Sequence, residues 1–280
     1  MELKWLETFT SVVREGSMSA AADQLGYSRS TVTHHVQNLE REFGAQLFDR
    51  QRGGILTQAG DVLMEHAPEV LRRVTLARNL TTRVGQQAVR LGATESVSIY
   101  RVPSMLQLLH RVLPQLGVAV EVGSTAEIID RLRQGGIDLA LIASTGDPVD
   151  LPSRDLCEEE IALIAPEGQS GRLSHRILLP QRGCVYREII ESEYLPQTPS
   201  AQIVQMGSLE TVKSGVLAGL GTGLLPVVAV RHMLARGQVT RLPWTPSTRV
   251  TARLAWNPRT CPQDVTVHLE RMGQRHLAVH

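Results

Sequence analysis

The first forty-four residues of this chain contain three short amphipathic segments, each followed by a glycine. Apolar residues recur at steps of three and four over residues 3–14, which predicts a helix that ends at Gly16. Further helices are predicted over 18–25 and 29–43, and Ser28 is a suitable N-cap for the third helix. Only a tight turn fits between the second and third helices. The pattern therefore predicts a helix-turn-helix.

A hairpin and a long helix are predicted next. Residues 47–57 form two apolar-edged arms around Gly53 and Gly54, which is typical of a small wing beside the third helix. Residues 59–87 carry apolar side chains every seven positions, a spacing typical of a dimerising helix. Pro68 lies inside this helix and is expected to bend it, because proline removes one backbone donor. The seven-residue seam consists of Leu63, Val70, Ala77 and Val84.

From residue 88 onward, strands are predicted to alternate with helices, which is typical of an α/β domain. Capping signals mark the helices. Ser124 and Glu127 form a capping box, and Ser208 precedes a helix expected over 209–219, while another helix is expected over 184–193. The predicted strands are 89–93, 118–122, 138–143, 161–165, 177–179, 203–206, 223–225, 239–242 and 253–256.

The charge balance excludes a disordered polyelectrolyte, since 29 basic residues oppose 28 acidic ones. The first 58 residues contain six basic and seven acidic residues, a net charge of −1. Any affinity of this segment for DNA must therefore come from the placement of a few side chains and from dimerisation, rather than from a strongly basic domain.

Cysteine usage and hydropathy indicate a cytoplasmic protein. The three cysteines, Cys157, Cys184 and Cys261, include no C-x-x-C pair, which argues against a disulfide framework or a structural zinc site. The N-terminal residues are amphipathic and partly acidic, unlike a signal peptide. The uncharged run 214–230 contains four glycines and Pro226, which favours a buried helix and strand over a membrane span.

The third helix has a polar face opposite its apolar stripe. In a helix-turn-helix, the second helix enters the major groove, where an arginine such as Arg29 can fork to guanine. Arginines in the wing suit phosphates or the minor groove. An ordinary solvated helix face is the alternative interpretation. The residues expected to contact DNA are Ser28, Arg29, Ser30, Thr31, Thr33, His34, Gln37, Arg50 and Arg52.

One ungapped series spans the first sixty positions and includes Gly16-Ser17, Ala20-Ala21-Ala22, Leu39-Glu40, Leu47-Phe48-Asp49-Arg50 and Leu56-Thr57-Gln58-Ala59-Gly60. This series resembles the N-terminal domain of LysR-type transcriptional regulators. The glycine-rich segment 219–226 also looks like one in that family. Arg29-Ser30 departs from the family's frequent Gln-Pro, so the base preference is not carried over.

The resemblance implies a winged helix-turn-helix, a long linker helix and a periplasmic-binding-protein-like α/β module of two subdomains. Such regulators are commonly dimers of dimers that bind promoter DNA and respond to a small molecule. RNA polymerase is a further expected partner. The implied division is 1–58 for DNA binding, 59–87 for the linker, and 88–280 for the effector module, with subdomain I at 88–144 and 247–280 and subdomain II at 145–246.

The resemblance also places the effector between the two subdomains, at loops that follow strands. Hydroxyl side chains and free backbone N–H groups at helix N-termini suit a small carboxylate, although the same serines can serve only as N-caps. The residues expected to bind the effector are Thr94, Glu95, Ser96, Ser124, Thr125, Cys184, Val185, Tyr186, Arg187, Ser208 and Thr222.

Two of these residues leave alternatives open. Glu95 would repel an acidic effector and attract an amine or a guanidinium, unless it pairs with Arg101 or Arg187. Cys184, at a helix N-terminus beside Arg187, suggests a redox sensor with a lowered thiol pKa. A buried and inert cysteine is the other interpretation.

Other classes of function fit the sequence less well. We find no G-x-S-x-G, H-E-x-x-H or P-loop motif, and His34 and His35 point about 100° apart on a helix, unlike a metal-binding pair. We therefore expect no enzyme, cofactor or metal site. A solute-binding protein would share the α/β module but lack the helix-turn-helix, and an enzyme with a DNA-binding head would need a catalytic constellation.

Overall fold

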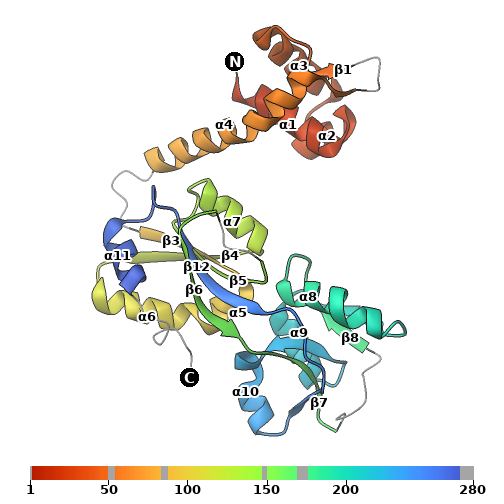
Figure 1. Cartoon of the computed structure of the whole chain (residues 1–280), viewed down its shortest axis with the longest axis vertical. Helices are drawn as coiled ribbons and strands as arrows, with labels where there is room; N and C mark the ends of the chain where they lie inside the picture. Colours follow the sequence, from red (N-terminus) through yellow and green to blue (C-terminus); the bar gives the residue numbers. More distant parts are fainter. Residues whose placement is uncertain (1, 50–53, 83–87, 147–149, 169–175, 272–280) are drawn as a thin grey trace. The chain divides into compact units, whose positions relative to one another are not determined.

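A computed structural model describes residues 2–49, 54–82, 88–146, 150–168 and 176–271, and the chain forms two compact units, Met1–Thr82 and Arg83–His280 (Figure 1). In the first unit, the helices are α1 (Leu3–Glu15), α2 (Met18–Leu25) and α3 (Arg29–Phe43). Their predicted bounds are confirmed to within one residue.

Glycines and a shared core define these three helices. Gly16, Gly26 and Gly44 follow them with φ angles of 71°, 67° and 65°, the left-handed region in which a side chain is strained. Phe9 of α1 and Val32 of α3 are fully buried in the core that the helices enclose. Each helix therefore stops at the residue that lets the chain turn back onto this core.

The two described arms of the wing are β1 (Phe48–Asp49) and β2 (Ile55–Leu56), which pair antiparallel as predicted. The linker helix α4 (Gln58–Thr82) continues through Pro68. Near its start, a Cβ on Gly60 would lie 2.2 Å from the Leu47 carbonyl oxygen, so only glycine fits there. Val84, the last predicted residue of the heptad seam, lies outside the described residues.

The second unit contains a five-stranded sheet in the order β4-β3-β5-β12-β6. β3 pairs parallel with β4 and β5, whereas β12 pairs antiparallel with β5 and β6. The bounds are β3 (Ala88–Ala93), β4 (Gly117–Val122), β5 (Leu139–Ser144), β6 (Ser153–Glu159) and β12 (Val250–Trp256), with helices α5 (Glu95–Tyr100), α6 (Val102–Val112), α7 (Thr125–Arg133) and α11 (Gln263–Arg271).

Alternate residues of β5 face opposite sides of this sheet. Leu139 and Leu141 belong to the core that α6 and α11 cover, and Ala140 and Ile142 belong to the core that α7 covers. All four are at most 1% exposed. The near-continuous apolar run in this segment is thus that of a central strand buried on both faces.

A second sheet and a two-stranded pair complete the unit. The second sheet has the order β10-β7-β11 and is antiparallel, while β8 and β9 pair parallel. The bounds are β7 (Ile161–Pro166), β8 (Arg176–Leu179), β9 (Gln202–Gln205), β10 (Gly223–Pro226) and β11 (Val239–Arg241), with helices α8 (Val185–Ile189), α9 (Leu209–Leu217) and α10 (Val227–Ala235). A π-helical turn, Ile190–Tyr194, extends α8.

Strand β6 was not predicted, and it lies in the first sheet although its residues were expected in the second subdomain. Four of its seven residues are charged, which hides the alternation of an ordinary strand. Those charges have partners in the fold: Glu159, for example, pairs with Arg101. At the end of β6, Glu159 stands opposite Val250 of β12, so the chain leaves and re-enters the first sheet on adjacent strands.

Within the described residues, no helix is long and apolar enough to cross a membrane, and no group of three or more His, Cys, Asp or Glu residues could hold a metal ion.

Candidate functional site

The N-terminal half of α3 presents a short exposed face. The Ser28 hydroxyl caps the helix by accepting a hydrogen bond from the Thr31 N–H at 3.1 Å. Arg29, Ser30 and His34 are exposed on the first turns of the helix. These side chains are held on a rigid element, because the opposite face of α3 is fixed in the core.

The other predicted DNA contacts are less exposed or lie outside the structure. Thr33 and Gln37 are half-buried, and the Thr33 hydroxyl donates to the Arg29 carbonyl oxygen at 2.9 Å. Arg50 and Arg52 fall outside the described residues.

The two adjacent histidines of α3 occupy different environments, as the helical geometry predicted. His34 is exposed, whereas His35 is buried, with its Nδ1 atom 2.9 Å from the Thr8 hydroxyl. The ring of Tyr27 meets His35 edge-on at 5.4 Å. Burial lowers the pKa of His35, so this side chain serves as a neutral core residue rather than as a DNA contact.

The second unit contains a cavity of about 350 Å³ lined by residues at the ends of β3, β4 and β5 of the first sheet and by residues that follow β8 and β9. Eight of the eleven residues expected to bind an effector line this cavity: Thr94, Glu95, Ser96, Ser124, Thr125, Cys184, Val185 and Tyr186. Sequence reasoning missed further lining residues, namely Val122, Glu127, Ala143, Gln181, Arg182 and Leu209. Some of these residues could have been predicted because they are sequence neighbours of predicted ones. Gln181 and Arg182, for example, directly precede the loop at Gly183.

The remaining three expected residues do not line the cavity. Arg187 is buried and its guanidinium donates to the Pro180 carbonyl oxygen at 3.0 Å and to Gln205 Oε1 at 2.7 Å. Ser208 caps α9 by accepting from the Thr211 N–H. Thr222 is fully buried. The interpretation of these residues as structural therefore fits their positions better.

Several hydroxyls of the cavity are engaged within the fold. The Thr94 hydroxyl accepts from the Ala143 N–H at 3.0 Å, and the Ser124 hydroxyl forms the predicted capping box with Glu127. Tyr186 differs from these. It is 1% exposed, and its hydroxyl has no hydrogen-bond partner among the described residues apart from the nearby Ser96 side chain. Burial raises the pKa of Tyr186, so the phenol is protonated and can both donate to and accept from a ligand.

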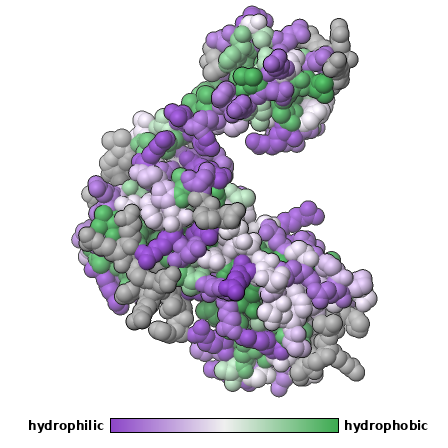
Figure 2. Space-filling model, viewed as in Figure 1, coloured by the Kyte–Doolittle hydropathy of each residue, from purple (hydrophilic) through white to green (hydrophobic). Residues whose placement is uncertain are grey.

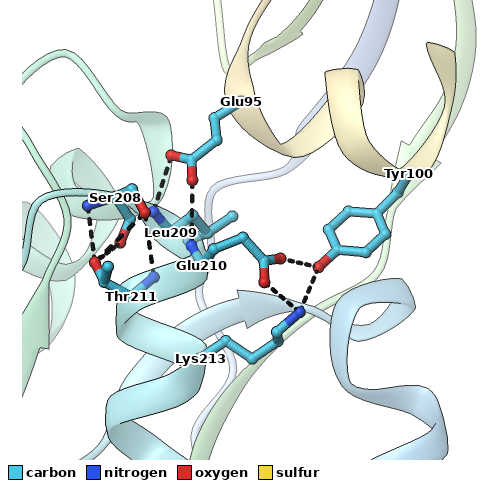
Figure 3. A network of polar contacts seen from close by, with 7 residues as sticks. All are labelled: Glu95, Tyr100, Ser208, Leu209, Glu210, Thr211 and Lys213. Atoms are coloured by element: carbon cyan, nitrogen blue, oxygen red, sulfur yellow. Dashed lines mark hydrogen bonds and ion pairs between the residues drawn. The ribbon is translucent and has the colours of Figure 1, made fainter.

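Glu95 pairs with neither arginine that the sequence offered. Its Oε2 atom accepts from the Leu209 N–H at 2.9 Å and its Oε1 atom from the Glu210 N–H at 3.2 Å (Figure 3). Arg101 instead forms a buried ion pair with Glu159. The Glu95 carboxylate therefore occupies the N-terminus of α9.

Cys184 is not an activated thiol. It precedes α8, yet burial raises its pKa to about 11, so the predicted lowering was wrong in direction. Cys184 is half-buried in the cavity wall, and its raised pKa favours the alternative of an unreactive cysteine.

A helix-turn-helix with a wing, a long linker helix, and an α/β unit around a cavity together form the architecture of a DNA-binding regulator with a ligand-binding module. Residues 3–61 match the family model of the bacterial regulatory helix-turn-helix protein, lysR family, and residues 83–270 match that of the LysR substrate binding domain. The chain belongs to the LysR family of transcriptional regulators, and it is not an enzyme.

Relatives and solved structures of similar length agree. The HTH-type regulator YusT of Bacillus subtilis is 31% identical over 87% of this chain and 85% of its own length, and YwqM of the same species is 29% identical over 92% and 93%. Full-length OxyR from Pseudomonas aeruginosa superposes with a TM-score of 0.56 at 25% identity, covering 100% of this chain and 95% of that one. Vibrio fischeri DarR gives 0.55 at 19% identity, covering 96% and 98%.

Proposed function

We propose that this protein binds promoter DNA through α3 and the wing, and that a small polar effector in the cavity changes the DNA complex. The observation that carries the first part is the exposed start of α3, where Arg29, Ser30 and His34 project from a helix anchored in the core. Arg29 is the proposed guanine contact. We also propose DNA contacts for Ser28, Thr31, Thr33 and Gln37 of this helix. Arg50 and Arg52 of the wing are proposed phosphate contacts.

The protein is further proposed to form a dimer through α4, and a dimer of dimers beyond that. An apolar groove of about 600 Å³ on the first unit supports the dimer, because it exposes Phe43 (50%), Val62 (54%) and Val70 (39%). Hydrophobic surface on this unit is visible in Figure 2. Surfaces of this kind mark protein contacts. The proposed domain division stays at 1–58, 59–87 and 88–280, and a cytoplasmic location and contact with RNA polymerase are part of the same proposal.

The effector is proposed to act by a population shift. Because the cavity is lined by loops of the first sheet and by the segments that follow β8 and β9, a bound molecule favours one relative orientation of the two subdomains. The Tyr186 hydroxyl, which is buried with only Ser96 as a hydrogen-bonding neighbour among the described residues, supports binding of a polar molecule there. A change in this orientation would alter the spacing of the DNA-binding units in the oligomer.

The test is a fluorescence-anisotropy titration of the full chain against the intergenic DNA beside its own gene, across a salt series. We expect salt-dependent binding that Arg29→Ala weakens by about 5–150-fold, the range for one lost bidentate base contact. Arg231→Ala, an exposed arginine of α10, is the matched control and should bind like the wild type. Equal, weak binding by all three proteins would refute the proposal.

A further inference from the structure

Two sets of polar contacts join α5 to α9 (Figure 3). Helix α5 follows β3 of the first sheet, and α9 packs on β8 and β10. The first set is the Glu95 carboxylate at the start of α9. In the second set, the Tyr100 hydroxyl donates to Glu210, and Lys213 Nζ donates to the Tyr100 hydroxyl at 3.0 Å. Lys213 also pairs with Glu210 at 2.5 Å. Polar contacts thus connect the two helices at both ends of α5.

The second set of contacts keeps the Tyr100 phenol in its donating form. Burial, reinforced by the hydrogen bond to Glu210, raises the pKa of Tyr100. The Lys213 ammonium also lies 5.6 Å from the centre of the Tyr100 ring, which is within the range of a cation–π contact. The Lys213 side chain is only 17% exposed, so its contacts with Tyr100 and Glu210 are largely shielded from solvent.

The first set of contacts occupies the backbone N–H groups with which the N-terminus of α9 could bind an anion. A helix N-terminus attracts anions because its first N–H groups have no acceptor within the helix. In α9 those of Leu209 and Glu210 donate to Glu95, and that of Thr211 donates to the Ser208 hydroxyl. All three of the first N–H groups therefore already have acceptors, and one of those acceptors is a carboxylate from the opposite subdomain.

The polar groups that remain in the cavity differ in character from these. The Tyr186 and Ser96 side chains are buried next to each other in the cavity wall, and the Tyr186 hydroxyl has no other hydrogen-bond partner among the described residues. The carboxylates of Glu95 and Glu127 also line the cavity, whereas Arg182, the one arginine among the described lining residues, is exposed and therefore strongly screened.

The geometry points to Glu95 as an internal carboxylate ligand, which holds the two subdomains together and selects against anions. The cavity therefore takes an uncharged or positively charged polar molecule, which the Tyr186 and Ser96 hydroxyls bind. An anion reaches α9 only by displacing a side chain tethered at an effective concentration of about millimolar or more. This inference rests on the proposed function of the cavity as the effector site.

Chemical rescue tests the internal ligand. Glu95→Ala removes a fragment that acetate matches in size and charge, so acetate should refill the vacated place in the full-length variant. We expect Glu95→Ala to lower Tm by at least about 3 °C, and acetate to restore more of Tm than equal concentrations of acetamide or chloride. Acetate should stabilise neither the wild type nor the matched control Glu188→Ala, whose carboxylate is exposed on α8.

Glu95→Gln provides the second variant, which keeps the shape of the side chain and serves if Glu95→Ala fails to fold. It should lose part of the stability and gain nothing from acetate, because the amide fills the place. Equal effects of acetate on wild type, Glu95→Ala and Glu95→Gln would overturn the inference.

Matched probes test the selection by charge. We expect calorimetry to detect propionate binding to Glu95→Ala at least tenfold more tightly than to the wild type, with propionamide and propylamine showing no such gain. Propionate that binds wild type and variant alike would overturn the selection against anions. The DNA titration with Arg29→Ala is independent of Glu95, so failure of the proposed function would be read separately.

Discussion

The buried ion pair between Arg101 and Glu159 ties the start of α6 to the edge strand β6. Arg101 Nε lies 2.5 Å from Glu159 Oε1 and its Nη2 atom 2.8 Å from Oε2, so the contact is bidentate. The two side chains are only 8% and 4% exposed. Removing one member of such a pair leaves a buried charge without its counter-charge, which costs about 3–5 kcal/mol.

We therefore expect Glu159→Leu to lower the Tm of the second unit by about 6–20 °C, at roughly 2–4 °C per kcal/mol for a unit of this size. The double variant Arg101→Met with Glu159→Leu should regain much of the loss, since no buried charge remains. Scanning calorimetry of the full chain measures both values.

The neighbouring pair supplies a matched control. Glu158 and Arg249 lie 3.0 Å apart, but their side chains are 57% and 78% exposed, so Glu158→Ala should cost less than about 0.5 kcal/mol. The reasoning would be refuted by a Glu159→Leu protein as stable as Glu158→Ala, or by a double variant no more stable than the single one.

Four further predictions follow from other features. Gly60→Ala should lower the free energy of unfolding of the first unit by more than about 1 kcal/mol in thermal unfolding, because its Cβ would meet the Leu47 carbonyl oxygen at 2.2 Å, and an unchanged Tm would contradict this. Cys184, with a pKa of about 11, should react with iodoacetamide slowly at neutral pH, and its rate should keep rising through pH 9–10; a plateau near pH 8.5 would show an exposed thiol. Since burial lowers the pKa of His35 below its unfolded value, the unfolded state binds more protons and the first unit should lose stability as pH falls below about 6.5, an effect that His35→Gln should remove from the pH dependence of Tm. Val70→Asp should convert the oligomer seen by light scattering into a smaller species, and an unchanged mass would place the dimer contact elsewhere.

Local signals made the first unit predictable. The glycines that end α1 to α3 and the serines that cap α2 and α3 are sequence neighbours of these helices, so the local sequence fixes most of their ends. The cavity was partly predictable for the same reason, since its loops follow strands with strong apolar runs. Ser124 and Glu127 formed the predicted capping box.

The features that could not be predicted from the sequence depend on contacts between residues far apart in the chain. The contact of Glu95 with α9 joins residues 114 positions apart, and nothing in the local pattern favours it over a pair with Arg101. Arg187 turns into its own subdomain because Gln205 and the Pro180 carbonyl offer acceptors there. Strand β6 escaped prediction because its charges are satisfied by partners that only the folded sheet brings near.

The two crossings between the sheets of the second unit lie on neighbouring, hydrogen-bonded strands, with Glu159 opposite Val250. Because these two strands are antiparallel and joined by hydrogen bonds, we expect the two sheets to rotate about the pair more easily than to twist against it. A relative movement of the two sheets would then be mainly a rotation about this one connection. If ligand binding rotates the sheets about this connection, different molecules in the cavity would all produce the same kind of movement and differ only in its extent.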